Sequence, residues 1–300
     1  MRVFLTGGTG YIGSAVLDAL VRAGHQVTAL VRDPEKAERL DARGAGPLLG
    51  DLGTPDRYLT AAVGHDAVVH TALAEGPRGP DLERAFLDAI LPALAAADGP
   101  RRFVHTSSVW VLGTRTTAAD EAVTPTPIPY STWRLAHEAQ VVAAAGPTLS
   151  TAVVRPGIVY GSGRGLVSDM LRDALNGLVR VIGDGTNRWA CVYDRDLAEL
   201  YLRVLTAPDA SGIYHGAGEE DERVTDIAEA ITRHVSPVAD IRHVPLPEAR
   251  GKLGPFAEGL ALDQIVRSPR ARALGWTPTM HGITGNAARL FEEYRRAARE

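Results

Sequence analysis

A run of closely spaced glycines near the N-terminus has the spacing needed to hold a phosphate group. The segment Thr6-Gly7-Gly8-Thr9-Gly10-Tyr11-Ile12-Gly13 places its key glycines at positions 7, 10 and 13. The first permits a tight turn, the second lets the main chain approach a pyrophosphate, and the third lets a helix pack on a strand. Exposed N–H groups and the helix dipole then hold the anion. We predict a dinucleotide-binding turn. Its cofactor-binding residues are Gly7, Thr9, Gly10, Tyr11, Ile12 and Gly13.

The end of the second apolar run bears on which dinucleotide binds. NAD-binding proteins of this architecture carry an acidic residue there, which holds the ribose 2′-hydroxyl. This chain has Val31 at that position, and Arg32 follows. A guanidinium forms charge-assisted hydrogen bonds with a 2′-phosphate, so Arg32 favours NADP. NAD stays as the alternative, because Asp33 could still reach the ribose, although its expected role is to cap the next helix.

The glycine turn needs a strand before it and a helix after it, and the sequence has both. Residues 2–6 form an apolar run, and residues 14–23 have helical spacing that ends at Gly24. Short apolar runs then alternate with helical stretches, a pattern typical of parallel strands with helices on both faces. Further strands are expected at residues 27–31, 67–70, 102–106, 151–154 and 212–214.

The fold class that follows is α/β, a doubly wound parallel sheet of the Rossmann type with a smaller C-terminal substrate lobe. Glycine and proline become frequent after Tyr160. We therefore expect a dinucleotide-binding domain at residues 1–160 and a mostly substrate-binding lobe at residues 161–300. Residues 190–217 are expected to return to the main sheet. Residues 286–298 form an amphipathic pattern typical of a packed terminal helix.

Composition excludes several classes of protein. The chain has 300 residues, of which 45% are apolar and 23% charged, as in ordinary globular proteins. Its single cysteine, Cys191, excludes a disulfide framework and a cysteine-rich zinc module, and favours the cytoplasm. A net charge of −4 gives no reason to expect nucleic acid. We also expect no membrane span, no signal peptide and no metal site, with His70 and His105 as hydrogen-bonded core histidines.

The order of motifs along the chain resembles the extended short-chain dehydrogenase/reductases, a superfamily that includes nucleotide-sugar epimerases and dehydratases. The resemblance covers nearly the whole chain, and jointly its motifs are specific. After the glycine turn they are Gly50-Asp51-Leu52, Val69-His70-Thr71-Ala72, Phe103 to Ser108, Pro129-Tyr130 with Arg134 and Glu138, Arg155 to Gly161, Asp196-Leu197-Ala198 and Leu274 to Pro278.

The resemblance implies that hydride passes between a nicotinamide and a carbonyl carbon. Ser108 takes the place of the catalytic serine or threonine, and Tyr130 that of the general acid or base. A free tyrosine has a pKa of about 10, which a nearby positive charge lowers. The family supplies that charge with a lysine four residues later, where this chain has Arg134. Either Arg134 keeps the lysine's role, which the chain's preference for arginine favours, or activity is lost or changed.

The resemblance also implies the remaining contacts to the cofactor, and it implies a homodimer. Asp51 and Leu52 would receive the adenine, while Thr71 and Ala72 would lie under the ribose. Arg134 would bind the ribose as well. The residues Pro156, Gly157 and Ile158 complete the expected cofactor site. Ser107 is expected to bond the main chain. Asp88 is expected either to find a local partner on its helix or to take part in catalysis.

The substrate is expected to be a small or medium apolar ketone or aldehyde, or the corresponding alcohol. The family's diphosphate-binding arginine would fall at Trp189, whereas the chain has Arg188, one residue early and so on the opposite face of a strand. An aromatic wall of the substrate site is expected from Trp110, Tyr160, Trp189 and Tyr193. The alternatives are a nucleotide-sugar epimerase or dehydratase with tightly bound NAD, and a redox-silent NADP-binding regulator.

Overall fold

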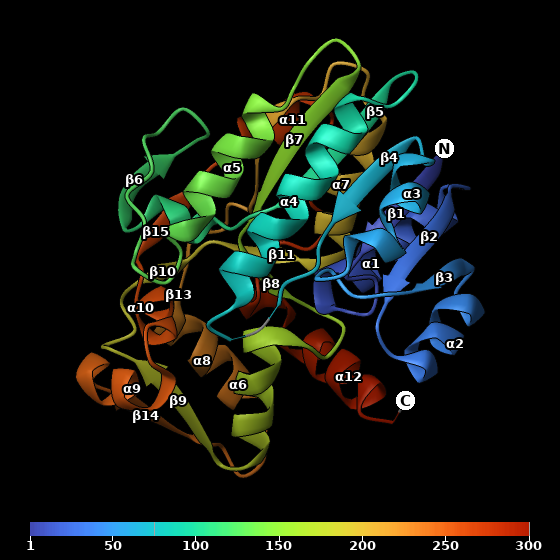
Figure 1. Cartoon of the computed structure of the whole chain (residues 1–300). Coiled ribbons are helices and arrows are strands. Elements are labelled where there is room, and N and C mark those ends of the chain that lie inside the picture. The colour runs from blue at the N-terminus through green and yellow to red at the C-terminus, as the bar shows by residue number, and fades with distance from the viewer. Residues whose placement is uncertain (75, 300) are drawn as a thin grey trace.

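A parallel sheet organises the computed structural model, which describes residues 1–74 and 76–299 (Figure 1). The sheet has seven strands in the order β12-β7-β5-β4-β1-β2-β3, and all neighbouring pairs run parallel. Its strands are β1 (Arg2–Thr6), β2 (Gln26–Val31), β3 (Ala45–Leu49), β4 (Ala67–His70), β5 (Arg101–Thr106), β7 (Leu149–Pro156) and β12 (Gly212–Gly216). The predicted fold class is confirmed.

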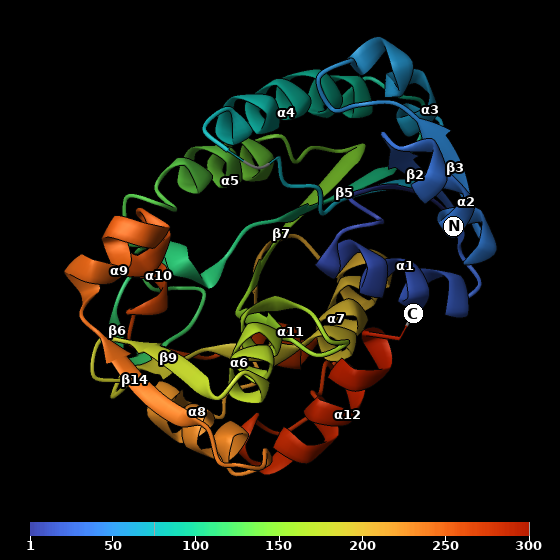
Figure 2. The same cartoon turned by 90° about the horizontal axis from the view of Figure 1, so that it is seen from below.

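Helices cover both faces of the sheet, because the strands are apolar on both sides. Val3 and Leu5 of β1 belong to one buried cluster, and Phe4 between them belongs to another. Figure 2 shows α1 and α7 on one face and α4 and α5 on the other. The helices around the sheet are α1 (Tyr11–Arg22), α2 (Pro34–Ala42), α3 (Leu59–Val63), α4 (Gly79–Ala95), α5 (Trp133–Ala143), α7 (Asp194–Thr206) and α11 (Pro269–Ala273).

The predicted strands are all present, but the sequence did not reveal β3. Its residues Ala45–Leu49 are mostly exposed and include Pro47. The strand pairs with β2 at the edge of the sheet, where a proline without an N–H group is tolerated. An edge strand lacks the continuous apolar run that marks a buried one.

A second group of elements packs around a separate apolar core beside the sheet. It contains α6 (Gly165–Leu175), α8 (Val224–Thr232), α9 (Leu246–Leu253), α10 (Phe256–Leu260) and α12 (Ala287–Ala297). Its strands are β6 (Arg115–Ala119), β8 (Ile158–Tyr160), β9 (Leu178–Ile182), β10 (Arg188–Trp189), β11 (Cys191–Tyr193), β13 (Glu222–Arg223), β14 (Asp240–Val244) and β15 (Gln264–Val266). In the pairing of β11 with β8, Cys191 lies opposite Ile158. Between β11 and β13 the chain returns to the sheet as β12, beside β7. Within the described ranges, no helix has the length and apolar character to span a membrane.

Candidate active site

A cavity of about 720 Å³ opens where the sheet strands end. Its lining includes residues at or just after the carboxyl ends of β1, β2, β4, β5 and β7. The size is typical of a site for a cofactor and a small substrate, and ligands of open α/β sheets bind at this edge.

The glycine turn borders this cavity and leaves the start of α1 open. Gly7 has a φ of +77°, and a Cβ there would lie 2.5 Å from the main-chain nitrogen of Ala72. Gly10 is the N-cap residue of α1 and has an extended conformation. Because glycine has no side chain, it cannot accept a hydrogen bond from the first N–H groups of the helix. Such a helix start attracts an anion. Of the predicted turn residues, Gly7, Thr9, Gly10, Tyr11 and Ile12 line the cavity.

Gly13 of the same turn lies outside the cavity lining and serves packing instead. A Cβ at this position would lie 2.1 Å from the carbonyl oxygen of Gly7 and 2.4 Å from Oγ1 of Thr71. Only glycine therefore lets α1 approach β1 and the segment after β4 this closely. That is the packing role expected of the third glycine.

One end of the cavity, at β2 and β3, carries positive charge. Arg32, Lys36, Asp51 and Leu52 all line it. Arg32 is exposed, and its Nη1 lies 3.7 Å from Oδ2 of Asp51, so this surface pair holds the guanidinium only weakly. Asp33 caps α2 as predicted, accepting a hydrogen bond from the N–H of Glu35 at 2.9 Å. The Asp33 carboxylate is therefore engaged in the cap.

The other end of the cavity, at β5 and β7, brings the predicted serine, tyrosine and arginine together. Ser108, Tyr130 and Arg134 line it together with Pro156 and Gly157. Thr71, Ala72 and Ile158 also line the cavity. The Oγ of Ser108 accepts a hydrogen bond from the N–H of Trp110 at 3.2 Å, which leaves its own proton free to donate.

Tyr130 lies among aromatic rings at the mouth of this end. The residue is 38% exposed, and its ring contacts Trp110 and Phe256 edge-on, with ring centroids 5.8 and 5.6 Å away. The rings of Trp110 and Phe256 are 5.4 Å apart. Both of these residues line the cavity, so the space next to the phenol has an apolar wall.

Arg134 is the second residue of α5, and its guanidinium carbon lies 4.4 Å from the ring centroid of Trp133. Burial lowers the pKa of Arg134, while Glu83, Tyr130 and Glu138 oppose that change. A guanidinium keeps its proton at any physiological pH. The side chain therefore supplies a permanent positive charge to this end of the cavity.

Buried charges support the wall of the site from behind. Arg155 of β7 forms a bidentate ion pair with Glu138 of α5, donating from Nη2 to Oε2 at 2.5 Å and from Nε to Oε1 at 3.0 Å. Ser107 donates to the same carboxylate, so our expectation of a main-chain partner for this hydroxyl was wrong. A side chain held in this way is preorganised rather than free to reach substrate. Asp88 of α4 accepts a hydrogen bond from Gln140 of α5 at 2.7 Å, so its partner comes from another helix and is not the local one that we expected.

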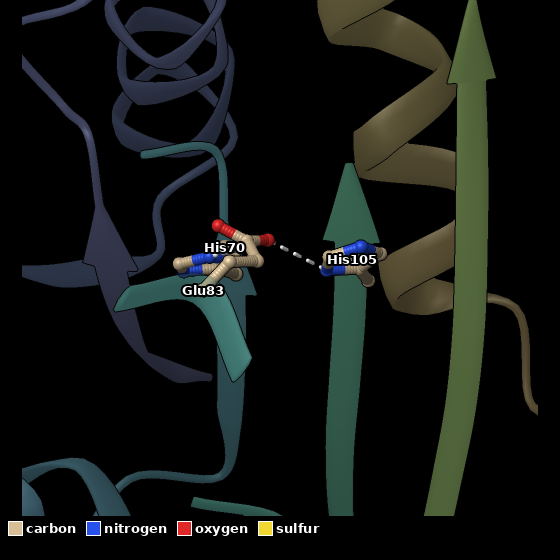
Figure 3. Close-up of side chains that lie close together, drawn as sticks. All are labelled: His70, Glu83 and His105. Atoms are coloured by element: carbon tan, nitrogen blue, oxygen red, sulfur yellow. Dashed lines mark ion pairs between the residues drawn. The ribbon is translucent and has the colours of Figure 1, made fainter. Parts of the chain in front are cut away.

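A buried trio lies beneath the site, formed by His70 at the end of β4, Glu83 of α4 and His105 of β5 (Figure 3). The Nε2 of His70 lies 3.1 Å, and the Nδ1 of His105 3.6 Å, from Oε1 of Glu83. His70 also contacts Oγ1 of Thr6 at 2.7 Å. Within the described chain, neither ring nitrogen of His105 has a hydrogen-bond partner, so the prediction of a satisfied histidine was wrong there.

Three residues of the expected aromatic wall lie outside the cavity lining. Tyr160 is buried with its hydroxyl 3.3 Å from the carbonyl of Met280, and Trp189 donates to the carbonyl of Leu260 at 3.0 Å. Tyr193 donates to Glu293 at 2.8 Å. Each polar tip is thus bound within the second core, and Trp110 is the one predicted wall residue that lines the cavity. Arg188 is likewise absent from the cavity lining and forms a bidentate ion pair with Asp263.

The cavity contains residues that the sequence did not single out, chiefly Lys36, Arg164 and Phe256. Lys36 lies in the first turn of α2, four residues after Arg32, a spacing that could have indicated it. Arg164 stands over the ring of Tyr11, with its Nη1 3.4 Å from the carbonyl of Gly10. Tyr11 in turn donates to the carbonyl of Gly161 at 2.7 Å, and burial raises its pKa. Phe256 comes from α10, far away in the sequence, and no local pattern marks it.

Comparison with known proteins gives a consistent result. The model of the family described as "NAD dependent epimerase/dehydratase family" matches residues 3–215. An uncharacterized protein of Schizosaccharomyces pombe is 32% identical over 291 residues, which are 93% of this chain and 95% of that protein. A 2-alkyl-3-oxoalkanoate reductase of Stenotrophomonas maltophilia is 33% identical over 227 residues, 70% of this chain and 68% of that protein.

Solved structures share the fold at low sequence identity. The UDP-glucose 4-epimerase of Thermus thermophilus in complex with NAD superposes with a TM-score of 0.81 at 21% identity. The match covers 98% of this chain and 99% of that one. This likeness concerns the arrangement of the helices and strands.

Proposed function

Because the chain belongs to the NAD dependent epimerase/dehydratase family, we propose that it is an NADP-dependent oxidoreductase that reduces a small or medium apolar ketone or aldehyde. The observation that carries this proposal is the meeting of Ser108, Tyr130 and Arg134 at one end of a cavity whose other end is basic. Because the two ends lie at opposite sides of β1 and β4, one extended dinucleotide would reach both.

The proposed reaction needs a proton donor and a charge stabiliser at the carbonyl oxygen. Hydride transfer to the carbonyl carbon puts negative charge on that oxygen. Tyr130 would donate the proton, and Ser108 would donate a hydrogen bond to the same oxygen. Arg134 would stabilise the phenolate that remains and bind the nicotinamide ribose. In the oxidation of an alcohol, the same phenolate would take the proton.

Two basic side chains support NADP over NAD. Arg32 and Lys36 line the end of the cavity where a 2′-phosphate would lie, and Asp33 is engaged in capping α2. Two cations suit a phosphate better than a hydroxyl, and the acid that also lines this end, Asp51, is the residue expected to receive the adenine. Asp51 and Leu52 would receive the adenine, and Thr71, Ala72, Pro156, Gly157 and Ile158 would complete the cofactor site.

Trp110 and Phe256 support an apolar substrate, since both rings flank Tyr130. The nucleotide-sugar alternative lacks its usual anion partner, because Arg188 is paired with Asp263.

We place the cofactor mainly in residues 1–160 and 190–217 and the substrate pocket mainly in the rest. A cytoplasmic homodimer is part of the same proposal, and light scattering in solution measures its mass.

The decisive experiment follows the loss of NADPH absorbance at 340 nm with a panel of apolar ketones and aldehydes. We expect turnover that falls by about 100-fold or more in Tyr130→Phe. Tyr294→Phe, on α12 outside the cavity lining, should leave turnover unchanged. Cofactor binding without turnover on any carbonyl would indicate the redox-silent regulator. NAD that stays bound through purification, with no net consumption, would indicate the epimerase or dehydratase.

A further inference from the structure

Arg164 is a cation in the cavity lining that the proposed reaction does not use. It lies in the loop that joins β8 to α6, within the second group of elements, and it reaches the glycine turn at the start of α1. Its Nη1 is 3.4 Å from the carbonyl oxygen of Gly10, and its guanidinium carbon is 5.6 Å from the ring centroid of Tyr11. The two groups of elements therefore meet at the turn that is built to hold a phosphate.

The loop that carries Arg164 is anchored by its neighbours. The hydroxyl of Tyr11 donates a hydrogen bond to the carbonyl of Gly161 at 2.7 Å. A Cβ at Gly165 would lie 2.7 Å from the Tyr11 ring, and one at Gly163 would lie 2.5 Å from a side chain of α12. The helix α12 lies beside α6 (Figures 1 and 2). The loop is thus packed closely on both the glycine turn and α12, which places Arg164 over the start of α1.

The guanidinium of Arg164 is only loosely held. The carbonyl oxygen of Gly10 already accepts the N–H of Ser14 at 3.0 Å, so the contact of 3.4 Å from Arg164 is long for a second hydrogen bond. Glu293 of α12, near the same loop, binds the hydroxyl of Tyr193 instead. In residues 1–74 and 76–299, no carboxylate lies within ion-pair distance of Arg164. The residue is exposed, so its guanidinium can turn to a ligand without breaking an ion pair.

The surroundings of Arg164 favour an anion. The start of α1 has no side-chain cap, and α6 begins directly after Arg164 with no acidic residue in its first turn. The N–H groups at a helix start carry partial positive charge, to which the guanidinium adds a full charge and a fork of donors that matches phosphate. The glycine turn follows β1, which lies between β2 and β4 in the sheet. The middle of a dinucleotide that spans the cavity would therefore lie here.

We propose that Arg164 is a binding residue for the diphosphate of the cofactor, supplied by the second group of elements. Its guanidinium would exchange the long contact with the Gly10 carbonyl for charge-assisted hydrogen bonds to phosphate oxygens. The inference rests on the proposed dinucleotide site. It does not depend on which carbonyl is reduced, and it does not require a 2′-phosphate, because NAD and NADP share the diphosphate.

Two other roles of Arg164 lead to different expectations. If it only tethered the loop to α1, Arg164→Met would unfold more readily in urea without any ligand. If it met an acidic group of the substrate, Arg164→Met would leave the affinity for the cofactor unchanged. A diphosphate contact instead leaves the free energy of unfolding of the unliganded protein unchanged and weakens the complex with the cofactor.

Binding of three ligands to the wild type and to Arg164→Met tests the proposal without any turnover. NADPH and NADH both contain the diphosphate, whereas adenosine 2′-monophosphate contains only the phosphate proposed to meet Arg32. Fluorescence titration measures the dissociation constants of the two dinucleotides, and competition with NADPH measures that of the monophosphate. Arg164→Met should weaken NADPH and NADH by about tenfold each and leave the monophosphate unchanged. Arg32→Ala should weaken NADPH and the monophosphate and leave NADH unchanged.

Controls and contrary outcomes complete the test. Arg172→Met removes an exposed arginine of α6 outside the cavity lining and should change none of these constants. Arg164→Lys keeps the charge without the planar fork, so it should recover part of the affinity, and it replaces Arg164→Met if that variant fails to fold.

Three results would overturn the role of Arg164 at the diphosphate. They are unchanged dissociation constants of both dinucleotides, equal weakening of the monophosphate, and a loss of stability in the unliganded variant with no loss of affinity. A wild type that binds both dinucleotides but reduces no carbonyl would refute the proposed function and leave this result standing.

Discussion

At the scale of single residues, Arg134 stands where the family resemblance led us to expect a lysine. Arg134 lines the cavity beside Tyr130 and Ser108, so the side chain supplies positive charge to the end that we propose to be catalytic. The sequence also did not reveal the buried Glu83 of α4, which contacts His70 and His105. Its partners come from β4 and β5, and only the fold brings them to α4.

Arg134→Lys should retain or raise the rate of carbonyl reduction, because lysine supplies the same charge at the position where the family has it. Arg134→Met should lower kcat by about 100-fold or more, since the phenol loses its neighbouring cation. Initial rates at saturating NADPH measure both. No turnover by the wild type and by Arg134→Lys would instead support a lost or changed function.

Arg32→Ala should raise the KM for NADPH by about tenfold, the worth of one charge-assisted contact to a phosphate, and leave the KM for NADH unchanged. Lys36→Ala should act in the same direction. Arg39→Ala, exposed on the same helix and outside the cavity lining, is the matched control. Equal effects of Arg32→Ala on both cofactors would contradict NADP preference.

At the scale of elements, the turn between β1 and α1 depends on close contact more than on flexibility. Gly13→Ala places its Cβ against the carbonyl of Gly7 and the hydroxyl of Thr71, so α1 must move. We expect the free energy of unfolding to fall by about 1–3 kcal/mol and NADPH binding to weaken. Urea unfolding and fluorescence titration measure the two effects.

The control for this change is Gly251→Ala in the middle of α9, where a Cβ meets nothing within 4 Å. That replacement should raise the free energy of unfolding by about 0.5–1 kcal/mol, because it restricts the unfolded chain. Unchanged stability and unchanged NADPH binding in Gly13→Ala would contradict the packing role.

Elements whose residues are apolar on both faces could be predicted from the sequence, and edge elements could not. The runs at β4, β5 and β7 are buried on both sides, and their boundaries agree with the sequence to within about two residues. The edge strand β3 has no such run.

The aromatic wall of the site also could not be predicted from local sequence spacing. Tyr160 and Trp189 satisfy their polar tips inside the second core, while Phe256 reaches the cavity from α10, and no local spacing distinguishes these cases.

At the scale of the whole molecule, buried histidines make stability depend on pH. Burial lowers the pKa of His105 to about 3 and, with help from Arg155, that of His215 to about 4. The unfolded chain takes up these protons near pH 6.5, while the folded chain does not. Stability is therefore fully present above that pH and falls as the pH drops below it.

We expect the free energy of unfolding to fall by about 2 kcal/mol for each of the two histidines between pH 7.5 and pH 5. Urea unfolding at several pH values measures how steeply the free energy of unfolding changes with pH. That slope counts the protons taken up on unfolding, and His215→Gln should lower the count by about one, even if the variant is less stable than the wild type. A slope that stays flat down to pH 5, or one that His215→Gln leaves unaltered, would show that these rings are protonated in the folded state.

The pairing of β11 with β8 gives the molecule a built-in reporter. The lone thiol, Cys191, sits opposite Ile158, which borders the cavity, and burial raises the pKa of that thiol. The thiol is half-buried, and its raised pKa leaves little of the reactive thiolate, so a thiol reagent should label it slowly, at a rate that reports changes around this strand pair. Saturating dinucleotide should slow the labelling, which would make occupancy of the site readable by mass spectrometry in the unmodified wild-type sequence.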